Sequence, residues 1–133
     1  MEAWEKWWRM AQGSLAAAQA LERQGEARSG ASRAYYAAYQ GATALSLHFR
    51  RVPPEGREAW SHEATPDLLN DISSTTLTLT TRRGLAKRME ELYQVRLIAD
   101  YRGEVDVTRA VLRDTVRSAA FIIKTIGTVF PGA

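Results

Sequence analysis

Hydrophobic residues recur every three or four positions along most of this chain, which is the spacing of an amphipathic α-helix. The first segment with this spacing covers residues 2–23 and ends before Gly25, a residue type that interrupts helices. One face of this predicted helix carries five apolar residues: Trp4, Trp8, Ala11, Leu15 and Ala18. We therefore predict that Trp4 and Trp8 pack in a helix interface, whereas Trp7 is the candidate for another role.

The second helix is predicted over residues 29–50, and it is only weakly polar on every side, as a central, buried helix is. Gly41 stands in its middle, where glycine costs about 1 kcal/mol relative to alanine. We therefore expect a neighbouring backbone to approach closely there. His48 lies on a side of small residues and is predicted to be a packed, hydrogen-bonded imidazole. Two prolines and a glycine within residues 53–56 then indicate a loop.

A short helix follows this loop, with Thr65 as its predicted N-cap and Pro66 at its first position. Residues 73–81 alternate as a strand does, but a single strand has nothing to pair with, so we predict an extended connector. The fourth helix is predicted over residues 81–100 and the last over residues 106–128. Four long helices and one short one predict an all-α fold, an antiparallel bundle of four to five helices.

The chain has 133 residues, the length of one domain, so we predict a single helical domain over residues 1–133. Cysteine is absent and there are two histidines, so we expect no structural zinc site and no other cofactor. No apolar run approaches the roughly 20 residues that cross a bilayer, and the N-terminal MEAWEKWW lacks the features of a secretory signal. We expect a soluble, cytoplasmic protein that does not enter a membrane.

The charge is mildly basic, with a formal net charge of +3, and it is dominated by arginine: fifteen arginines against three lysines. Guanidinium groups suit the recognition of phosphate and carboxylate, but a GC-rich genome produces the same bias through its codons. Arg82 and Arg83 form a basic segment at the start of the fourth helix. The last helix carries a ridge of four basic residues: Arg109, Arg113, Arg117 and Lys124. Such residues form a solvated face, follow an RNA backbone or bind an acidic partner.

Arg96 is the residue that fits the helical pattern least. With Leu85 at 0° on the fourth helix, a turn of 100° per residue places Arg96 at about 20°, in the middle of the apolar stripe. An unpaired charge in a core costs several kcal/mol, so this arginine needs a partner or a partly wet cleft. Asp100, one turn later, can pair with it. Two interpretations remain open: a structural ion pair that fixes the register of the bundle, or an arginine that holds a phosphate in a groove between subunits.

Two segments of the sequence resemble the HEPN domain family. The second helix contains SRAYYAAYQGATALSL, which includes the Ala/Tyr-rich RAYYA type of element, and the fourth helix ends in RLIADYRGE. The first helix, with its aromatic start, is also similar to small stand-alone members, so the resemblance covers the chain from about Trp4 to Ile126. The resemblance implies a helical bundle that commonly dimerises. We expect a homodimer with the Arg96 segments near the shared face.

The resemblance also implies an activity. Many HEPN proteins are metal-independent RNases of toxin–antitoxin, phage-defence or CRISPR-linked systems, and they are often encoded beside a minimal nucleotidyltransferase. Their RNase motif is an arginine followed, after four to six residues, by a histidine. Arg96 matches the arginine, but Tyr101 stands at the shortest histidine spacing. Arg102 and Gly103 stand at the longer spacings, so the motif histidine is missing.

The missing histidine limits the chemistry. Histidine titrates near neutral pH and can transfer the protons of RNA cleavage, whereas Tyr101, with a tyrosine pKa near 10, is a poor base at pH 7. Tyr101 can still donate a hydrogen bond or stack on a base, and Arg96 can stabilise phosphate charge. The candidate catalytic residues are therefore Arg96, Tyr101 and Asp100, in a metal-independent ribonuclease whose activity is weakened or lost.

The remaining candidates complete the predicted site. The candidate RNA- or phosphate-binding residues are Arg96, Arg102, Arg82 and Arg83, and the candidate auxiliary residues are His62 and Tyr36. The leading hypothesis is an RNA- or nucleotide-binding component of a toxin–antitoxin or defence system. One alternative is a non-catalytic scaffold or regulatory partner of a nucleotidyltransferase, with Tyr101 as the modification target. Another is a purely structural bundle.

Overall fold

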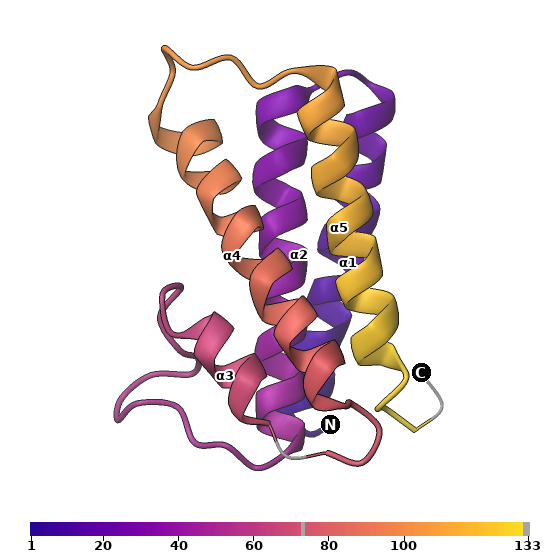
Figure 1. Cartoon of the computed structure of the whole chain (residues 1–133), viewed down its shortest axis with the longest axis vertical. Helices are drawn as coiled ribbons and strands as arrows, with labels where there is room; N and C mark the ends of the chain where they lie inside the picture. Colours follow the sequence, from indigo (N-terminus) through magenta and orange to yellow (C-terminus); the bar gives the residue numbers. More distant parts are fainter. Residues whose placement is uncertain (73, 132–133) are drawn as a thin grey trace.

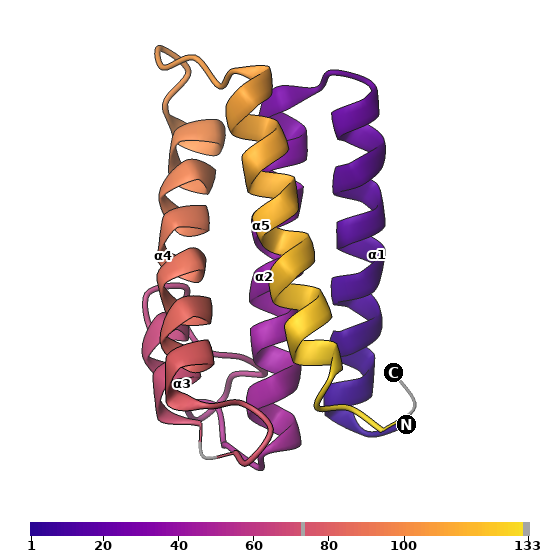
Figure 2. The same cartoon turned by 45° about the vertical axis from the view of Figure 1, so that its right-hand side comes forward.

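The computed structural model of the protein describes residues 1–72 and 74–131, and in this part of the chain it contains five helices and no strand. The helices are α1 (Ala3–Arg23), α2 (Ala27–His48), α3 (Thr65–Asp71), α4 (Leu79–Tyr101) and α5 (Arg109–Gly127). The four long helices run in alternating directions, and the short α3 lies beside the first half of α4 (Figures 1 and 2). The predicted all-α, antiparallel bundle is confirmed.

α2 is the central helix, as its weakly polar sequence predicts. It contacts each of the other four helices, and most of its small residues are fully buried. A Cβ atom on Gly41 would lie only 2.7 Å from Cδ1 of Ile123 on α5. A Cβ atom on Gly30 would lie 2.6 Å from Cδ1 of Leu112 on the same helix. The close approach expected at Gly41 therefore occurs, but a side chain of α5 makes it rather than a backbone.

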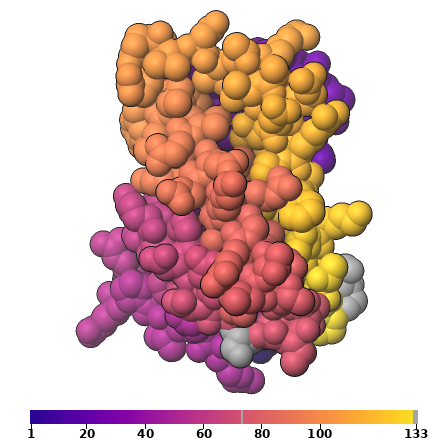
Figure 3. All heavy atoms as spheres, viewed as in Figure 1, coloured from indigo at the N-terminus to yellow at the C-terminus, as the bar shows by residue number. Residues whose placement is uncertain are grey.

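The core lies between the long helices and is built from large apolar side chains. Those of the long helices that are no more than 2% exposed include Leu45, Leu85, Met89, Leu92, Leu112, Ile122 and Ile126. Complete burial of such a side chain contributes about 1.5–3 kcal/mol. On the face seen in Figure 3, the side chains of α4 and α5 lie against each other.

The start of α4 differs from the prediction because of a threonine cap. The Thr78 side chain accepts a hydrogen bond from the backbone N–H of Thr81 at 3.2 Å, and α4 begins at Leu79. Such a cap satisfies one of the backbone donors left unpaired in the first turn. The last three residues of the predicted extended connector are therefore helical, which corrects that prediction. Its first residue, Ser73, lies outside the described residues.

Other helix ends also differ from the prediction by a few residues. Thr108 caps α5 by accepting a hydrogen bond from the N–H of Val111 at 3.2 Å, so the helix begins later than predicted. The prediction of Thr65 as an N-cap is wrong, because Thr65 is the first residue of α3. Its hydroxyl donates instead to the carbonyl of Ser61 at 3.1 Å. α2 begins and ends two residues earlier than predicted.

Aromatic side chains close the end of the bundle where the chain starts. Trp8 is buried, and the ring of Phe130 packs 4.8 Å from it and 4.5 Å from Trp4. The ring of His48 meets Trp4 edge-on at 5.0 Å, so its packing is confirmed, whereas the described residues give its imidazole no hydrogen bond. Trp7 is partly buried and packs against the same core. All three N-terminal tryptophans therefore belong to helix packing.

Candidate functional site at the end of α4

Arg96 points inward from α4 and makes three hydrogen bonds. It is 9% exposed. Its Nε donates to Oδ2 of Asp100 at 2.9 Å, one turn later on the same helix. Its Nη2 donates to the hydroxyls of Tyr36 at 2.8 Å and Tyr101 at 3.2 Å. The inward position and the pairing with Asp100 are those predicted from the helical pattern. We call Arg96, Tyr36, Asp100 and Tyr101 the Arg96 cluster.

The cluster keeps the guanidinium charged. The guanidinium carbon of Arg96 lies 5.4 Å from the ring centroid of Tyr36 and 5.1 Å from that of Tyr101, within the range of cation–π attraction. Burial acts to lower the pKa of Arg96, but the two tyrosines and Asp100 together raise it above its ordinary value. A buried charge is tolerated when hydrogen bonds and an opposite charge replace its water. Asp100 supplies the opposite charge and a hydrogen bond, and the two tyrosine hydroxyls supply further hydrogen bonds.

Exposure increases across the cluster toward the surface. The side chain of Arg96 is 10% exposed and that of Asp100 27% exposed, whereas Tyr101 is 67% exposed. The three hydrogen bonds of Arg96 use Nε and Nη2 and do not use Nη1. The cluster is thus fixed at its inner side and opens to solvent at Tyr101, which is a geometry that an anionic ligand can approach.

α2 holds the end of α4 with three side chains spaced by four residues. Tyr36 contacts Arg96, and the Ser32 hydroxyl donates to Oδ2 of Asp100 at 3.1 Å. Arg28, one turn earlier, donates to the backbone of the last turn of α4 and the following loop. Its acceptors are the carbonyls of Ile98 (3.1 Å), Ala99 (3.2 Å), Arg102 (3.3 Å), Gly103 (3.3 Å) and Val105. The carbonyls of Ile98 and Ala99 lie in the last turn of α4, at the negative end of the helix dipole, so a cation suits this place.

Sequence reasoning missed Arg28 and Ser32. A signal was present, because Arg28, Ser32 and Tyr36 share one face of a helix that is otherwise rich in alanine. The last turn of α4 contains no basic residue of its own. The pattern therefore indicated a polar stripe on α2, although not the partner that the stripe contacts.

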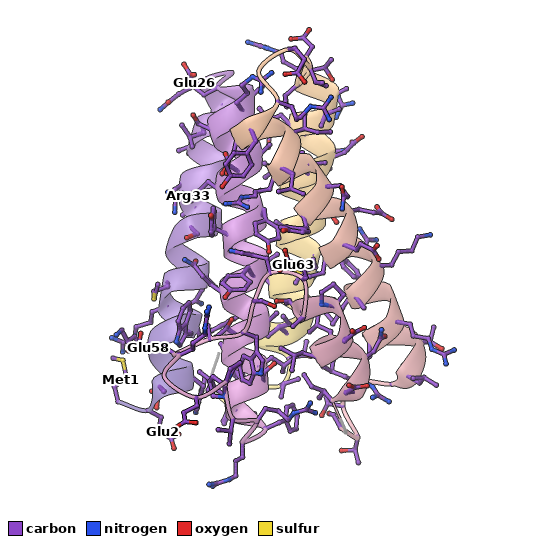
Figure 4. All side chains as sticks on the ribbon, turned by 90° about the vertical axis from the view of Figure 1, so that its left-hand side faces the viewer. Met1, Glu2, Glu26, Arg33, Glu58 and Glu63 are labelled. Atoms are coloured by element: carbon purple, nitrogen blue, oxygen red, sulfur yellow. The ribbon has the colours of Figure 1, made fainter. Side chains whose placement is uncertain are left out.

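A second group of aromatic residues surrounds His62, in the loop between α2 and α3. Nδ1 of His62 lies 2.6 Å from the hydroxyl of Tyr35, with which it shares a hydrogen bond. The His62 ring lies 4.5 Å from the ring centroid of Tyr39 and stacks on Tyr93 at 5.8 Å, with the two planes 7° apart. The loop that carries Glu63 crosses α2 at this place (Figure 4). His62 is therefore fixed in position although it belongs to a loop.

Tyr36 connects His62 to the Arg96 cluster. Its ring centroid lies 5.9 Å from that of His62, and its hydroxyl accepts from Arg96. Burial, and to a smaller degree the charge of Arg96, lower the pKa of His62, while Glu63 offsets part of this effect. His62 is thus neutral at pH 7. The structure brings both predicted auxiliary residues, His62 and Tyr36, to the cluster.

The predicted phosphate-binding arginines separate into two places. Arg102 is exposed at the end of α4, next to the cluster, and its Nε lies 2.5 Å from Oε1 of Glu104. Arg82 and Arg83 lie at the other end of α4, about 20 Å from Arg96 at a rise of 1.5 Å per residue. They do not join the Arg96 cluster.

Arg82 has a structural role of its own. Its Nη1 donates to the carbonyl of Asn70 at 2.9 Å and to that of Ile72, at the end of α3. Arg83 lines an open groove between α3 and α4, together with Asp67 and Asp71. The four residues of the basic ridge on α5 are exposed, as a solvated face would be: Arg109, Arg113, Arg117 and Lys124.

The described part of the chain shows neither a metal-binding cluster nor a membrane-spanning helix. Within residues 1–72 and 74–131, no three His, Asp or Glu side chains are arranged to hold a metal ion. Among the helices described, none is both long and apolar enough to cross a membrane.

The comparison with known families decides the classification. A scan against protein families matches the HEPN domain over residues 4–129. This chain belongs to the HEPN domain family. The family resemblance of the two quoted segments is confirmed, and the Arg96 cluster of this HEPN protein lies where the second of them, RLIADYRGE, ends α4.

A solved structure shares the fold of this chain. The HEPN protein is similar to the crystal structure of TT1696 from Thermus thermophilus, with a TM-score of 0.79 and 20% sequence identity. The match covers 98% of this chain and 100% of that chain. At this identity the likeness shows a shared fold. A search of the curated proteins found no match.

Proposed function

We propose that this HEPN protein binds RNA or a nucleotide through a phosphate at the Arg96 cluster, as a component of a toxin–antitoxin or defence system. The observation that carries the proposal is the buried guanidinium of Arg96, held by two tyrosines and opening to solvent at Tyr101. Membership of the HEPN family supports the biological setting.

The geometry suits phosphate binding because the arginine is already positioned. Asp100 and Tyr36 fix its planar fork, so little conformational entropy is lost when a ligand binds. A phosphate oxygen can accept from Nη1 or replace the Tyr101 hydroxyl as the acceptor of the Nη2 hydrogen bond. Charge-assisted hydrogen bonds of this kind are about twice as strong as neutral ones. The exposed ring of Tyr101 is then available to stack on a base.

The groups present favour binding over cleavage. Cleavage without a metal needs one group that takes the proton from the 2′-OH and one that protonates the leaving oxygen. Tyr101 stands in place of the motif histidine, and Nδ1 of His62 already shares a hydrogen bond with Tyr35. Phosphate recognition, by contrast, requires no proton transfer.

Fluorescence anisotropy with a labelled single-stranded RNA tests the proposal. Arg96→Met keeps an unbranched side chain of similar length in the apolar stripe and removes the charge. We expect it to weaken RNA binding by about ten-fold or more, since a charged hydrogen bond contributes about 1.5–3 kcal/mol. Arg117→Met removes the same charge from the exposed face of α5 and should change affinity little.

Circular dichroism first establishes that the variants fold. A folded Arg96→Met protein with wild-type affinity would refute the proposal. The same RNA, incubated with protein and a chelator, should remain intact. Degradation by wild type that is lost in Arg96→Met would instead identify a metal-independent ribonuclease at this site.

The exposure of Tyr101 favours a second function, in which the protein is the regulatory partner of a minimal nucleotidyltransferase. Tyr101 is an exposed residue, and its hydroxyl lies 3.2 Å from Nη2 of Arg96, which can stabilise the charge of an incoming phosphate. In the transfer, the tyrosine oxygen bonds to the α-phosphorus of the nucleotide, pyrophosphate leaves, and the phenolic proton passes to solvent. Incubation with such an enzyme and ATP should add one nucleotide to wild type. The absence of modification, or its persistence in Tyr101→Phe, would exclude Tyr101 as the acceptor.

In either function we propose that the protein acts as a homodimer with two Arg96 clusters bordering one cleft. Light scattering coupled to size exclusion should give twice the chain mass of 14.9 kDa. A monomer at the concentrations used for RNA binding would exclude a shared cleft.

A further inference from the structure

A second arginine, Arg33, contacts the Tyr36 ring of the Arg96 cluster from the preceding turn of α2. The guanidinium carbon of Arg33 lies 5.9 Å from the ring centroid of Tyr36, and that of Arg96 lies 5.4 Å from the same centroid. Arg33 is more accessible to solvent than the buried Arg96. The two guanidinium carbons are therefore separated by no more than the sum of these distances, and two phosphates of one short strand can reach both.

Arg33 also borders a shallow groove between α1 and α2. The groove has a volume of about 470 Å³ and is lined by Met10, Gly13, Ser14, Ala17, Arg33 and Gln40. In Figure 4 the labelled Arg33 lies on the α1 side of α2. A Cβ atom on Gly13 would meet nothing within 4 Å, so this part of the groove is open. Pockets for small organic groups have volumes of about 300–1,000 Å³.

The lining of the groove suits a flat, partly apolar group. Ser14 and Gln40 form its polar part, and their side chains are hydrogen-bonded to each other at 2.7 Å. Met10 is 39% exposed beside them, and a thioether makes favourable contacts with aromatic rings. A nucleobase suits such a groove, because its polar side chains, Ser14 and Gln40, are already hydrogen-bonded to each other and the Met10 thioether can contact the flat ring.

Arg33 adds positive charge that the cluster itself lacks. Asp100 neutralises Arg96 within the cluster. Among the described residues, the other ion pairs are Arg102–Glu104 and Arg113–Asp114, and Arg33 takes part in neither. Its charge is therefore available to a ligand at the surface next to Tyr36.

We propose that Arg33 is a second phosphate-binding residue and that the α1–α2 groove receives the adjacent base of a single-stranded RNA. This inference rests on the proposed function, because it extends one strand from the Arg96 cluster across Tyr36. It specifies the ligand class as a strand of at least two nucleotides rather than a mononucleotide.

The salt dependence of RNA binding tests the role of Arg33. For single strands, the slope of log K against log salt changes by about 0.7 for each phosphate contact. Arg33→Ala should therefore reduce the slope for a labelled octanucleotide by about 0.7 and weaken binding by about five-fold at low salt. Arg117→Ala removes an equal charge from α5 and should leave the slope unchanged.

A steric variant tests the groove without changing charge. Gly13→Leu fills the open part of the groove and lies on the exposed side of α1, so the fold should be retained. We expect weaker binding of the octanucleotide and unchanged binding of a mononucleotide.

The outcomes separate the two proposals. If Arg96→Met abolishes binding while Arg33→Ala and Arg117→Ala give equal slopes, the Arg33 contact is wrong and the proposed function stands. Equal binding by Gly13→Leu and wild type would overturn the groove as a base site. If Arg96→Met binds like wild type, the proposed function fails, and the inference about Arg33 fails with it.

Discussion

Arg28 provides the sharpest test of how this fold holds its candidate site. One guanidinium donates to five backbone carbonyls at the end of α4, in the turn that carries Asp100 and Tyr101. The substitution Arg28→Ala removes all of these donors at once. It also removes a cation from the negative end of the α4 dipole, whose last turn holds no basic residue.

The expected loss follows from the burial of the acceptors. The carbonyls of Ile98, Ala99 and Val105 are part-buried at their contacts with Arg28, whereas those of Arg102 and Gly103 are exposed and can bond to water instead. In Arg28→Ala the Ile98 carbonyl would still accept a hydrogen bond from the backbone N–H of Arg102, which lies at 3.0 Å. A buried acceptor left without its partner costs about 1–3 kcal/mol. We therefore expect a loss of about 2 kcal/mol in the free energy of unfolding, well below the sum of five charged hydrogen bonds.

Thermal and urea unfolding measure this loss. An unfolding entropy of about 2.1 cal/mol/K per residue over 133 residues converts 2 kcal/mol into a fall in Tm of about 7 °C. Arg28→Lys keeps the charge but not the planar fork, so it should lie between wild type and Arg28→Ala. Arg9→Ala removes an exposed arginine of α1 as the matched control. If Arg28→Ala and Arg9→Ala unfold within about 0.5 kcal/mol of each other, the proposed clamp on α4 is wrong.

Two further predictions concern stability. Gly84 lies inside α4, and a Cβ there meets nothing within 4 Å, so Gly84→Ala should stabilise the protein by about 1 kcal/mol in urea unfolding. Gly41→Ala should not be stabilised in this way, because its methyl group would lie 2.7 Å from Cδ1 of Ile123. Equal increases in the free energy of unfolding for Gly84→Ala and Gly41→Ala would contradict the packing described. Burial lowers the pKa of His62 in the folded protein from its ordinary value of 6.5. The contribution of neutral His62 to the free energy of unfolding is therefore complete above pH 6.5 and is lost as the pH falls through the pKa of the folded state. The urea concentration at half-unfolding of wild type should therefore be lower at pH 5.5 than at pH 7.5, and the decrease should be smaller for His62→Gln. Equal decreases in the two proteins would contradict this role of His62.

The sequence by itself determined the parts of the fold that depend on local periodicity. A turn of 100° per residue was enough to predict five helices, a central α2 and an inward Arg96 paired with Asp100. Helix ends were less well predicted, because single caps such as Thr78 and Thr108 set them. The local pattern also predicted that a charge inside the apolar stripe needs a partner.

Only the tertiary structure decided which groups surround Arg96. Arg28, Ser32 and Tyr36 lie 60 to 77 positions away from the atoms that they contact at the end of α4. His62 reaches the cluster through a loop, and Arg82 is drawn away from it by the carbonyls of α3. Residue spacing describes neighbours on one helix, whereas contacts between helices depend on how the whole core packs, which no local pattern contains.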